Sequence, residues 1–358
     1  MTEEDQNDRQ QKFSGTKPVQ NHLKFDSNKL AQWLSKSLDR SVSIEKIEEF
    51  KGGQSNPTYK VKTDEETFVL RRKPPGKLLP SAHAVDREYR VIDALYQNNF
   101  PVPRAIAYCE DRTILGTEFY LMDFIAGNIY WNISLPGLDP EIRAKIFDAK
   151  ISTLAKLQNI NFEKAGLSTF GKTSDYMARQ IHRWSKIYKA SETSKIPSMD
   201  KLIEWLPKNI PSNNETCIIH GDYRLDNMVF DAKTSEVIAV LDWELSTLGD
   251  PLGDFVYHLA PWFSPDVGEK VPSLSNISFK EHGIPTEEEY ISRYCELTNR
   301  QTVDQIAFYK AYTLWRVAAI YQGILKRAED GTAASSDANT NIEIIIEFAD
   351  SALGLIKN

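Results

Sequence analysis

One polar loop stands between two short apolar runs in the segment IIHGDYRLDNMVF, which carries His220, Asp222, Asp226 and Asn227. Polar groups that are costly to desolvate are kept in such a place when a ligand satisfies them, or when an Asx-rich turn satisfies its own backbone. A second acidic element, VIAVLDWE, follows and places Asp242 at the end of an apolar strand. A turn alone would not require this second carboxylate, so the pattern favours a chemical role.

The spacing His220-x-Asp222-x-x-x-x-Asn227 matches that of the protein-kinase catalytic loop, H-R-D-x-x-x-x-N. Phosphoryl transfer needs one carboxylate that orients the attacking hydroxyl and accepts its proton. It also needs amide and carboxylate oxygens that hold Mg²⁺ across the phosphates. The loop and Asp242 together offer this set of groups. We interpret His220 and Asp226 as structural, a packed imidazole and a turn or cap residue.

A nucleotide also needs a phosphate clamp, and the segment FKGGQSNPTYKV offers small residues between two predicted strands: Gly52, Gly53, Ser55 and Asn56. Residues without bulky side chains let backbone amides approach phosphate oxygens. Hairpin turns use glycine pairs routinely, so this signal is weak alone. The segment matches neither the Walker A loop nor G-x-G-x-x-G, which excludes the P-loop and Rossmann interpretations.

Two further segments fit a kinase. Arg71 lies in the predicted strand FVLRRK and Glu88 in the predicted helix VDREYRV. A strand cation paired with a helix carboxylate fixes nucleotide phosphates in kinases, although a solvent-exposed pair is the commoner outcome for two such residues. We expect the strand EFYLMDFIAG to run between lobes, where its backbone near Met122, Asp123 and Phe124 would read the edge of adenine.

Beyond a polar N-terminal tail, the sequence divides into a strand-rich region and a helix-rich region, which together must position these residues. Residues 1–24 are polar and predict a disordered or loosely attached tail. Residues 25–126 alternate in short strands with one amphipathic helix and predict an antiparallel N-lobe that clamps the nucleotide. Residues 127–358 show helical periodicity around the strand-loop-strand segment and predict the C-lobe with the catalytic loop and acceptor site. The predicted class is α+β, a protein-kinase-like fold of two lobes.

Four passages in this order resemble the aminoglycoside phosphotransferase and choline kinase superfamily: YKVKTDEETFVLRRKPPGKLLPSAHAVDREYRVIDAL, IIHGDYRLDNMVFD, VLDWELSTLGDPLGDF and LWRVAAIYQGILKRAEDGTA. The resemblance covers nearly the whole chain. It is strongest to the phosphotransferase domain that is fused to acyl-CoA dehydrogenases in some animals.

By position, this resemblance implies that Asp222 is the catalytic base and that Asn227 and Asp242 bind Mg²⁺. It implies Arg71 as the phosphate-binding cation and Glu88 as its partner, with ATP as the phosphoryl donor. It also implies a small-molecule acceptor, a hydroxyacyl-CoA or hydroxy acid, and a functional partnership with an acyl-CoA dehydrogenase. An aminoglycoside, choline, homoserine or sugar kinase remains an alternative, as does a catalytically silent nucleotide-binding fold, although retention of the three site residues disfavours the silent fold.

The chain departs from the family pattern at two positions. Arg71 stands where antibiotic kinases usually have Lys, which favours the choline-kinase-like and dehydrogenase-associated branches. Gln158 stands where many relatives have a His after the first long helix, so any support that this His gives the catalytic loop must come from elsewhere. Arg224 either steers an anionic acceptor or braces the loop against a carboxylate.

Two groups of residues are left without a single role. The basic cluster of RRKPPGK either faces a phosphate-rich substrate or is a solvated loop; it contains Arg71, Arg72, Lys73 and Lys77. Residues of the last third either line the acceptor pocket or belong to the core: Tyr257, Trp262, Tyr312, Trp315 and Arg316.

Bulk composition narrows the class of protein. The net charge of -7 argues against a nucleic-acid binder, which needs a concentrated basic surface. Three widely spaced cysteines predict reduced thiols rather than a disulfide framework or metal cluster. No apolar stretch is long enough to span a membrane, and the N-terminal residues lack the apolar core of a secretory signal. We therefore expect a cytoplasmic protein.

Overall fold

The computed structural model describes residues 10–52, 56–76, 83–212, 215–268, 271, 273–332 and 341–356. The chain divides into two compact units. Unit 1 comprises residues 1–138, 160–170 and 224–246, and unit 2 comprises residues 139–159, 171–223 and 247–358. The sequence order suggested two consecutive lobes, whereas the chain enters unit 1 three times.

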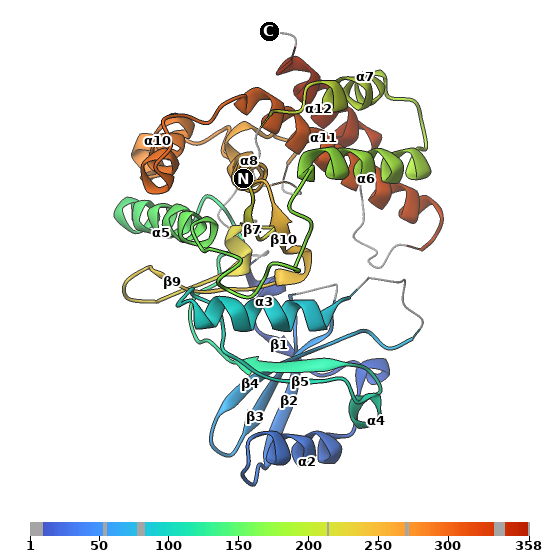
Figure 1. The fold of residues 1–358 in the computed structure, drawn as a ribbon, viewed down its shortest axis with the longest axis vertical. Coiled ribbons are helices and arrows are strands. Elements are labelled where there is room, and N and C mark those ends of the chain that lie inside the picture. The colour runs from blue at the N-terminus through green and yellow to red at the C-terminus, as the bar shows by residue number, and fades with distance from the viewer. Residues whose placement is uncertain are drawn as a thin grey trace. The chain divides into compact units, whose positions relative to one another are not determined.

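Unit 1 contains a six-stranded antiparallel sheet in the order β1-β2-β3-β4-β6-β5 (Figure 1). Its strands are β1 (Thr16–Lys17), β2 (Ile44–Phe50), β3 (Thr58–Thr63), β4 (Thr67–Arg72), β5 (Ala105–Cys109) and β6 (Phe119–Asp123). Alternation in β3 turns Tyr59 and Val61 into the core, as the sequence pattern predicted.

Three helices accompany this sheet: α2 (Ser27–Ser37), α3 (Val85–Gln97) and α4 (Arg112–Leu115). Asp26 caps α2, because its carboxylate accepts hydrogen bonds from the backbone N–H groups of Asn28 and Lys29. Leu30 and Leu34 of α2 are fully buried against the sheet. The spacing of Leu30, Trp33 and Leu34 in the sequence predicts this apolar face, with Asp26 or Ser27 as the cap, and the structure confirms the face and assigns the cap to Asp26.

The segment before Phe25 contributes to unit 1, although the sequence analysis expected a loose tail up to residue 24. Thr16 and Lys17 of β1 pair with Phe50 and Glu49 of β2. The backbone oxygen of Leu23 accepts a hydrogen bond from Arg72 Nη2 at 2.7 Å. Backbone pairing holds this stretch together with two apolar side chains, the buried Leu23 and Val19, which packs against the core.

A hairpin of β8 (Met228–Phe230) and β9 (Val237–Val240) also belongs to unit 1. The backbone of Asn128 pairs with Phe230, and the N–H of Val240 donates to Pro101 O at 2.8 Å. Trp243, just after β9, is buried and packs edge-on against Phe100 at a ring distance of 5.9 Å. Contacts distant in sequence therefore fix the hairpin.

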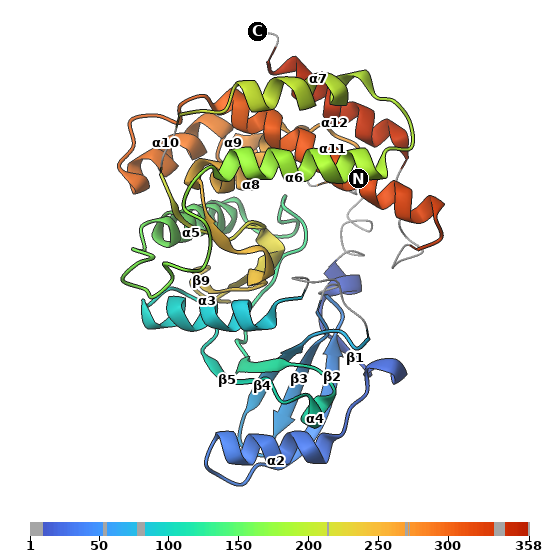
Figure 2. The ribbon, with the colours of Figure 1, turned by 45° about the vertical axis from the view of Figure 1, so that its right-hand side comes forward.

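Unit 2 is mainly helical (Figure 2). Its helices are α5 (Pro140–Gln158), α6 (Tyr176–Ser191), α7 (Pro197–Trp205), α8 (Pro251–Phe263), α9 (Phe279–His282), α10 (Glu287–Thr298), α11 (Ile306–Glu329) and α12 (Ile342–Gly354). Helix α11 packs against α6, α8 and α12. A short antiparallel pair, β7 (Cys217–Ile219) and β10 (Thr247–Gly249), completes the unit.

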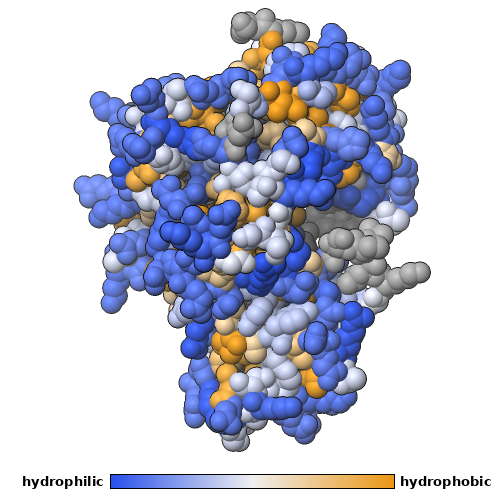
Figure 3. All heavy atoms as spheres, in the orientation of Figure 1, coloured by the Kyte–Doolittle hydropathy of each residue, from blue (hydrophilic) through white to orange (hydrophobic). Residues whose placement is uncertain are grey.

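The two strands that flank the polar loop therefore have different partners, β10 for β7 and β9 for β8. Polar side chains cover most of the face drawn in Figure 3. Across the described ranges, we find no helix that combines the length and apolar character needed to cross a membrane.

Candidate active site

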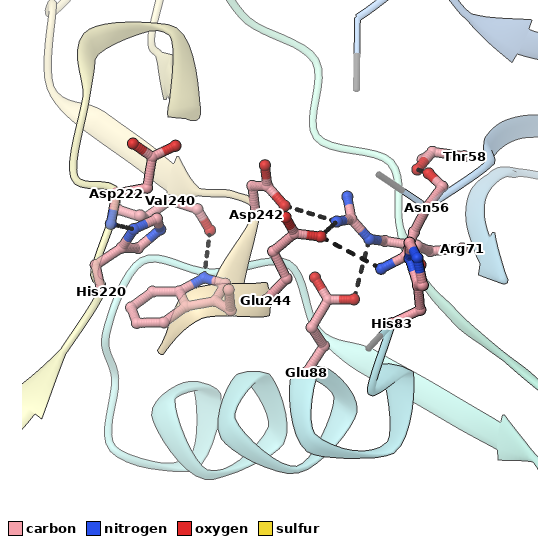
Figure 4. A network of polar contacts seen from close by, with 11 residues as sticks. Asn56, Thr58, Arg71, His83, Glu88, His220, Asp222, Val240, Asp242 and Glu244 are labelled. Atoms are coloured by element: carbon pink, nitrogen blue, oxygen red, sulfur yellow. Dashed lines mark hydrogen bonds and ion pairs between the residues drawn. The ribbon is translucent and has the colours of Figure 1, made fainter. Parts of the chain in front are cut away.

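Arg71 of β4 is the centre of a charged network in unit 1 (Figure 4). Its Nε donates to Glu88 Oε2 of α3 at 3.0 Å. Its Nη2 donates to Asp242 Oδ1 at 2.6 Å and to Glu244 Oε2 at 3.3 Å. The strand cation and helix carboxylate predicted from the sequence are thus paired, and the same cation contacts the predicted metal ligand.

Burial sets the protonation behaviour of this network. Arg71 and Glu88 are both almost fully buried. Burial raises the pKa of Glu88 to about 7, and Arg71 opposes that effect. Burial also lowers the pKa of Arg71, but Glu88 and Asp242 outweigh this effect and raise it overall, so the guanidinium keeps its charge. Within the described residues, Glu88 Oε1 is buried without a hydrogen-bond partner.

The hairpin brings Asn227 and Asp242 to the same end of unit 1. Met228 pairs with Val240, and the N–H of Leu241 donates to the backbone oxygen of Asn227 at 2.8 Å. Asp242 follows directly with φ 63° and ψ 61°. A non-glycine residue in this left-handed region costs conformational energy, and such residues concentrate at functional sites.

Asn227 and Asp242 supply the kind of donors that Mg²⁺ prefers, an amide oxygen and a carboxylate. Magnesium usually takes one or two protein carboxylates and completes its shell with waters and substrate phosphates. Within the described ranges, no group of three or more His, Cys, Asp or Glu side chains is arranged to hold a metal ion. The donor set therefore fits a metal shared with a nucleotide rather than one enclosed by protein.

The predicted phosphate loop is described in part. Gly53 and Ser55 lie outside the described residues. A Cβ at Gly52 would come within 2.9 Å of the Trp131 indole, so close packing requires glycine there. Asn56 is buried; its Nδ2 donates to Glu244 Oε2 at 3.5 Å and its Oδ1 lies 2.9 Å from His83 Nδ1. Asn56 therefore joins the Arg71 network.

The segment predicted to read adenine lies at the end of β6. Met122 pairs with Val69 of β4 and Ala105 of β5. The N–H groups of Asp123 and Phe124 donate to Arg104 O at 3.0 Å and Thr67 O at 3.4 Å. These two donors are used within unit 1, and recognition of adenine by this segment stays a prediction.

Asp222 lies in unit 2, on a loop whose backbone N–H groups are bound by Asp254 of α8. The N–H groups of His220 and Gly221 donate to the two oxygens of Asp254, each at 2.9 Å. The Asp222 N–H donates to Nδ1 of the buried His220 at 3.3 Å (Figure 4). The Tyr257 hydroxyl donates to Asp222 Oδ1 at 2.6 Å. These contacts agree with a structural role for His220 and leave the Asp222 carboxylate partly exposed.

Gln158, which replaces the usual His, does not contact this loop through the hydrogen bonds of its side chain that the structure describes. Its Nε2 donates to Pro251 O at 3.0 Å, and its Oε1 accepts from the Tyr294 hydroxyl at 2.6 Å. Tyr223 anchors the loop instead, through its hydroxyl on Lys150 O at 2.9 Å. Support for the loop therefore comes from Asp254 and Tyr223.

Several sequence interpretations change. Arg72 is buried and donates to Tyr59, Leu115 and Leu23, so it cannot face a substrate. Lys73 pairs with Glu118, and Lys77 lies outside the described residues. Arg224 forms an ion pair with Asp226 at 3.2 Å, which supports its bracing role.

Sequence reasoning missed Glu244 and Asp254 of these networks, and it named Tyr257 only as a residue of the acceptor pocket or the core. Glu244 stands beside Asp242 in LDWE, and Asp254 stands in the apolar first turn of α8. A buried carboxylate in an apolar helix start needs hydrogen-bond donors, and that signal would have identified Asp254.

Comparison with known proteins gives the family. The model described as "Phosphotransferase enzyme family" matches residues 46–277. Acyl-CoA dehydrogenase family member 10 of Mus musculus is 41% identical over 338 residues, which cover 94% of this chain and 32% of that protein. The chain thus spans about a third of the length of this relative.

Solved structures agree in fold. A crystal structure from Ralstonia eutropha, assigned to the aminoglycoside phosphotransferases, is 40% identical with a TM-score of 0.85 and covers 93% of this chain and 99% of its own. Spectinomycin phosphotransferase in complex with ADP and spectinomycin has a TM-score of 0.60 at 12% identity, covering 96% of this chain and 100% of its own, and supports the fold alone. The predicted kinase-like α+β fold is confirmed, and the chain belongs to the phosphotransferase enzyme family.

Proposed function

We propose that this phosphotransferase is an ATP- and Mg²⁺-dependent kinase that phosphorylates a hydroxyl group of a small molecule. The observation that carries the proposal is the contact of Arg71 with both Glu88 and Asp242. A cation fixed by a helix carboxylate and adjacent to a metal-binding carboxylate is the arrangement that nucleotide phosphates require. Asn56 and Glu244 complete the polar environment of that cation.

In the proposed reaction, the acceptor oxygen forms a bond to the γ-phosphorus while the bond from the γ-phosphorus to the β–γ bridging oxygen breaks. The hydroxyl proton passes to the carboxylate of Asp222, and ADP leaves. Mg²⁺, held by Asn227 and Asp242, would neutralise phosphate charge. The ion pair with Arg71 holds the carboxylate of Asp242, and the Asp254 contacts fix the loop that carries the base.

We propose a hydroxyacyl-CoA or hydroxy acid as the acceptor. The similarity to acyl-CoA dehydrogenase family members supports this class and a functional partnership with such a dehydrogenase. Asp222, Asn227 and Asp242, the proposed base and metal ligands, are all present, which supports an active enzyme over a catalytically silent fold.

The test measures release of the nucleoside diphosphate, ADP from ATP or GDP from GTP, with a panel of acceptors: 3-hydroxybutyryl-CoA, 3-hydroxybutyrate, kanamycin, choline, homoserine and glucose. We expect ADP release that depends on the hydroxyacyl compounds and stops with EDTA. Asp222→Ala should abolish it, while Asp226→Asn, in the same loop, should retain it. Turnover on kanamycin or choline alone would refute the proposed acceptor, and ADP release that persists in Asp222→Ala would refute the mechanism.

A further inference from the structure

Arg316 of α11 is a cation enclosed by aromatic rings in unit 2. Its guanidinium lies 4.8 Å from the centre of the Tyr257 ring on α8 and 5.5 Å from that of Trp184 on α6. The two rings stabilise the charge through cation–π contacts. Arg316 is only partly exposed.

The hydrogen-bonding capacity of this guanidinium is largely unused. Arginine carries five N–H donors. Arg316 Nη2 donates to the backbone oxygen of Gly221 at 3.3 Å. In the part of the chain that the structure describes, Arg316 forms no ion pair with a carboxylate, and its buried Nε has no hydrogen-bond partner. Asp222 and Asp254 interact electrostatically with this guanidinium without forming an ion pair with it, so within the described residues most of its Nη donors are available to an anionic ligand.

Arg316 lies close to the proposed base, Asp222, through its contacts with Gly221 and Tyr257. Gly221, which it contacts, directly precedes Asp222 in the chain. Tyr257, whose ring it faces, donates to Asp222 Oδ1 at 2.6 Å. The guanidinium therefore contacts the residue that precedes Asp222 in the chain and the tyrosine that donates to its carboxylate. An anion bound to it would lie near the base, and the positive charge would offset repulsion between that anion and Asp222.

We propose that Arg316 recognises the acceptor by binding an anionic oxygen group, either a carboxylate or a phosphate. The inference rests on the proposed function, because it concerns the acceptor of that reaction. The same positive charge disfavours cationic acceptors, since an ammonium group near Arg316 would be repelled. Arg316 thus selects for acids and phosphate-bearing thioesters against aminoglycosides and choline.

The test measures binding of matched ligands by isothermal titration. One pair is 3-hydroxybutyrate and its neutral methyl ester; the other is 3-hydroxybutyryl-CoA and its pantetheine thioester, which lacks phosphates. The variants are Arg316→Gln, Arg316→Lys and a control, Arg183→Gln, whose guanidinium lies 5.9 Å from the same Trp184 ring. Thermal unfolding checks that each variant is folded.

We expect Arg316→Gln to weaken the anionic ligand about 10- to 100-fold, from the strength of hydrogen bonds to charged groups. Arg316→Lys should recover part of the loss, and Arg183→Gln and the neutral ligand should change little. A loss confined to the acid identifies a carboxylate, and a loss confined to the CoA thioester identifies a phosphate.

Equal losses for charged and neutral ligands, or a fall in kcat with unchanged affinity, would overturn the inference and leave Arg316 a support of the loop. Wild-type protein that binds none of the ligands at millimolar concentration would overturn it as well. Anion binding that depends on Arg316 without ADP release would refute the proposed function and leave the recognition role standing.

Discussion

The Arg71 network of unit 1 and the Asp222 loop of unit 2 are held by different kinds of interaction. Arg71 bonds to three side-chain carboxylates, those of Glu88, Asp242 and Glu244. The Asp222 loop is fixed through backbone N–H groups that donate to Asp254. A buried charge network depends on each charge in it, whereas a loop held by its backbone can present a side chain that folding does not need.

Residues of the Arg71 network therefore contribute to both folding and the proposed chemistry, whereas the Asp222 side chain contributes to the proposed chemistry without being needed for folding. Substitutions in the network should change nucleotide binding and folding together. Substitution of Asp222 should change turnover alone.

The largest expected effect is that of Asp222→Ala on turnover. A general base typically contributes 10²- to 10⁴-fold, so we expect a loss of about that size once an acceptor is known. The midpoint of thermal unfolding should stay near wild type, because the carboxylate is partly exposed. Steady-state ADP release and calorimetry measure both quantities. Full turnover in the variant would exclude Asp222 as the base.

Substitution of Asp254, which anchors the Asp222 loop, should lower both turnover and stability. Asp254→Ala leaves the N–H groups of His220 and Gly221 without their acceptor, and we expect a loss of about 3 kcal/mol in the free energy of unfolding. Asp254→Asn keeps one acceptor oxygen, so its free energy of unfolding should lie between those of wild type and Asp254→Ala. Urea denaturation gives the values. An unchanged free energy would show that the loop does not depend on these bonds.

Asp242→Asn tests the metal side of the network. It keeps an oxygen ligand but removes a charge, so we expect affinity for Mg²⁺-ATP to fall about tenfold, the order of one lost charge-assisted contact. Asp231→Asn, at the other end of the same hairpin, is the matched control. Titration of ATP with and without Mg²⁺ separates the metal-dependent part of the affinity from the metal-independent part. Unchanged Mg²⁺ dependence would remove Asp242 from the metal site.

The smallest effect concerns a charged cluster of unit 1 outside the proposed site. Lys73 and Arg112 lower the pKa of Glu118 to about 2. Because the folded pKa lies below the unfolded value, Glu118 stabilises the fold above about pH 4.5 and loses that contribution as pH falls toward 2. Glu118→Gln should flatten stability against pH over this range in acid titrations. An unaltered profile would contradict the assignment.

Local pattern was enough to predict most elements. Alternation identified β3, and the spacing of Leu30, Trp33 and Leu34 identified α2. The order of Arg71, Glu88, Asn227 and Asp242 along the chain predicts a phosphate and metal site, since phosphoryl transfer needs these residue types, and their roles stay a prediction. Of these, the structure joins Arg71, Glu88 and Asp242 directly.

Long-range pairing could not be predicted. Residues 16–23 are held by backbone pairing and by only two apolar side chains, Val19 and Leu23, so the sequence suggested a tail there. The hairpin carrying Asn227 and Asp242 joins unit 1 through Asn128 and Pro101, and nothing in its own residues indicates these partners. Tyr257 is recognised as a partner of Asp222 only from its contact in three dimensions.

The most direct test of this division of labour compares Arg71→Ala with Asp222→Ala in the same titration of Mg²⁺-ATP, with turnover measured in parallel. The account predicts that Arg71→Ala weakens nucleotide binding at least tenfold, whereas Asp222→Ala binds Mg²⁺-ATP like wild type and releases no ADP. Equal losses of nucleotide affinity in the two variants, or turnover in Asp222→Ala, would contradict it.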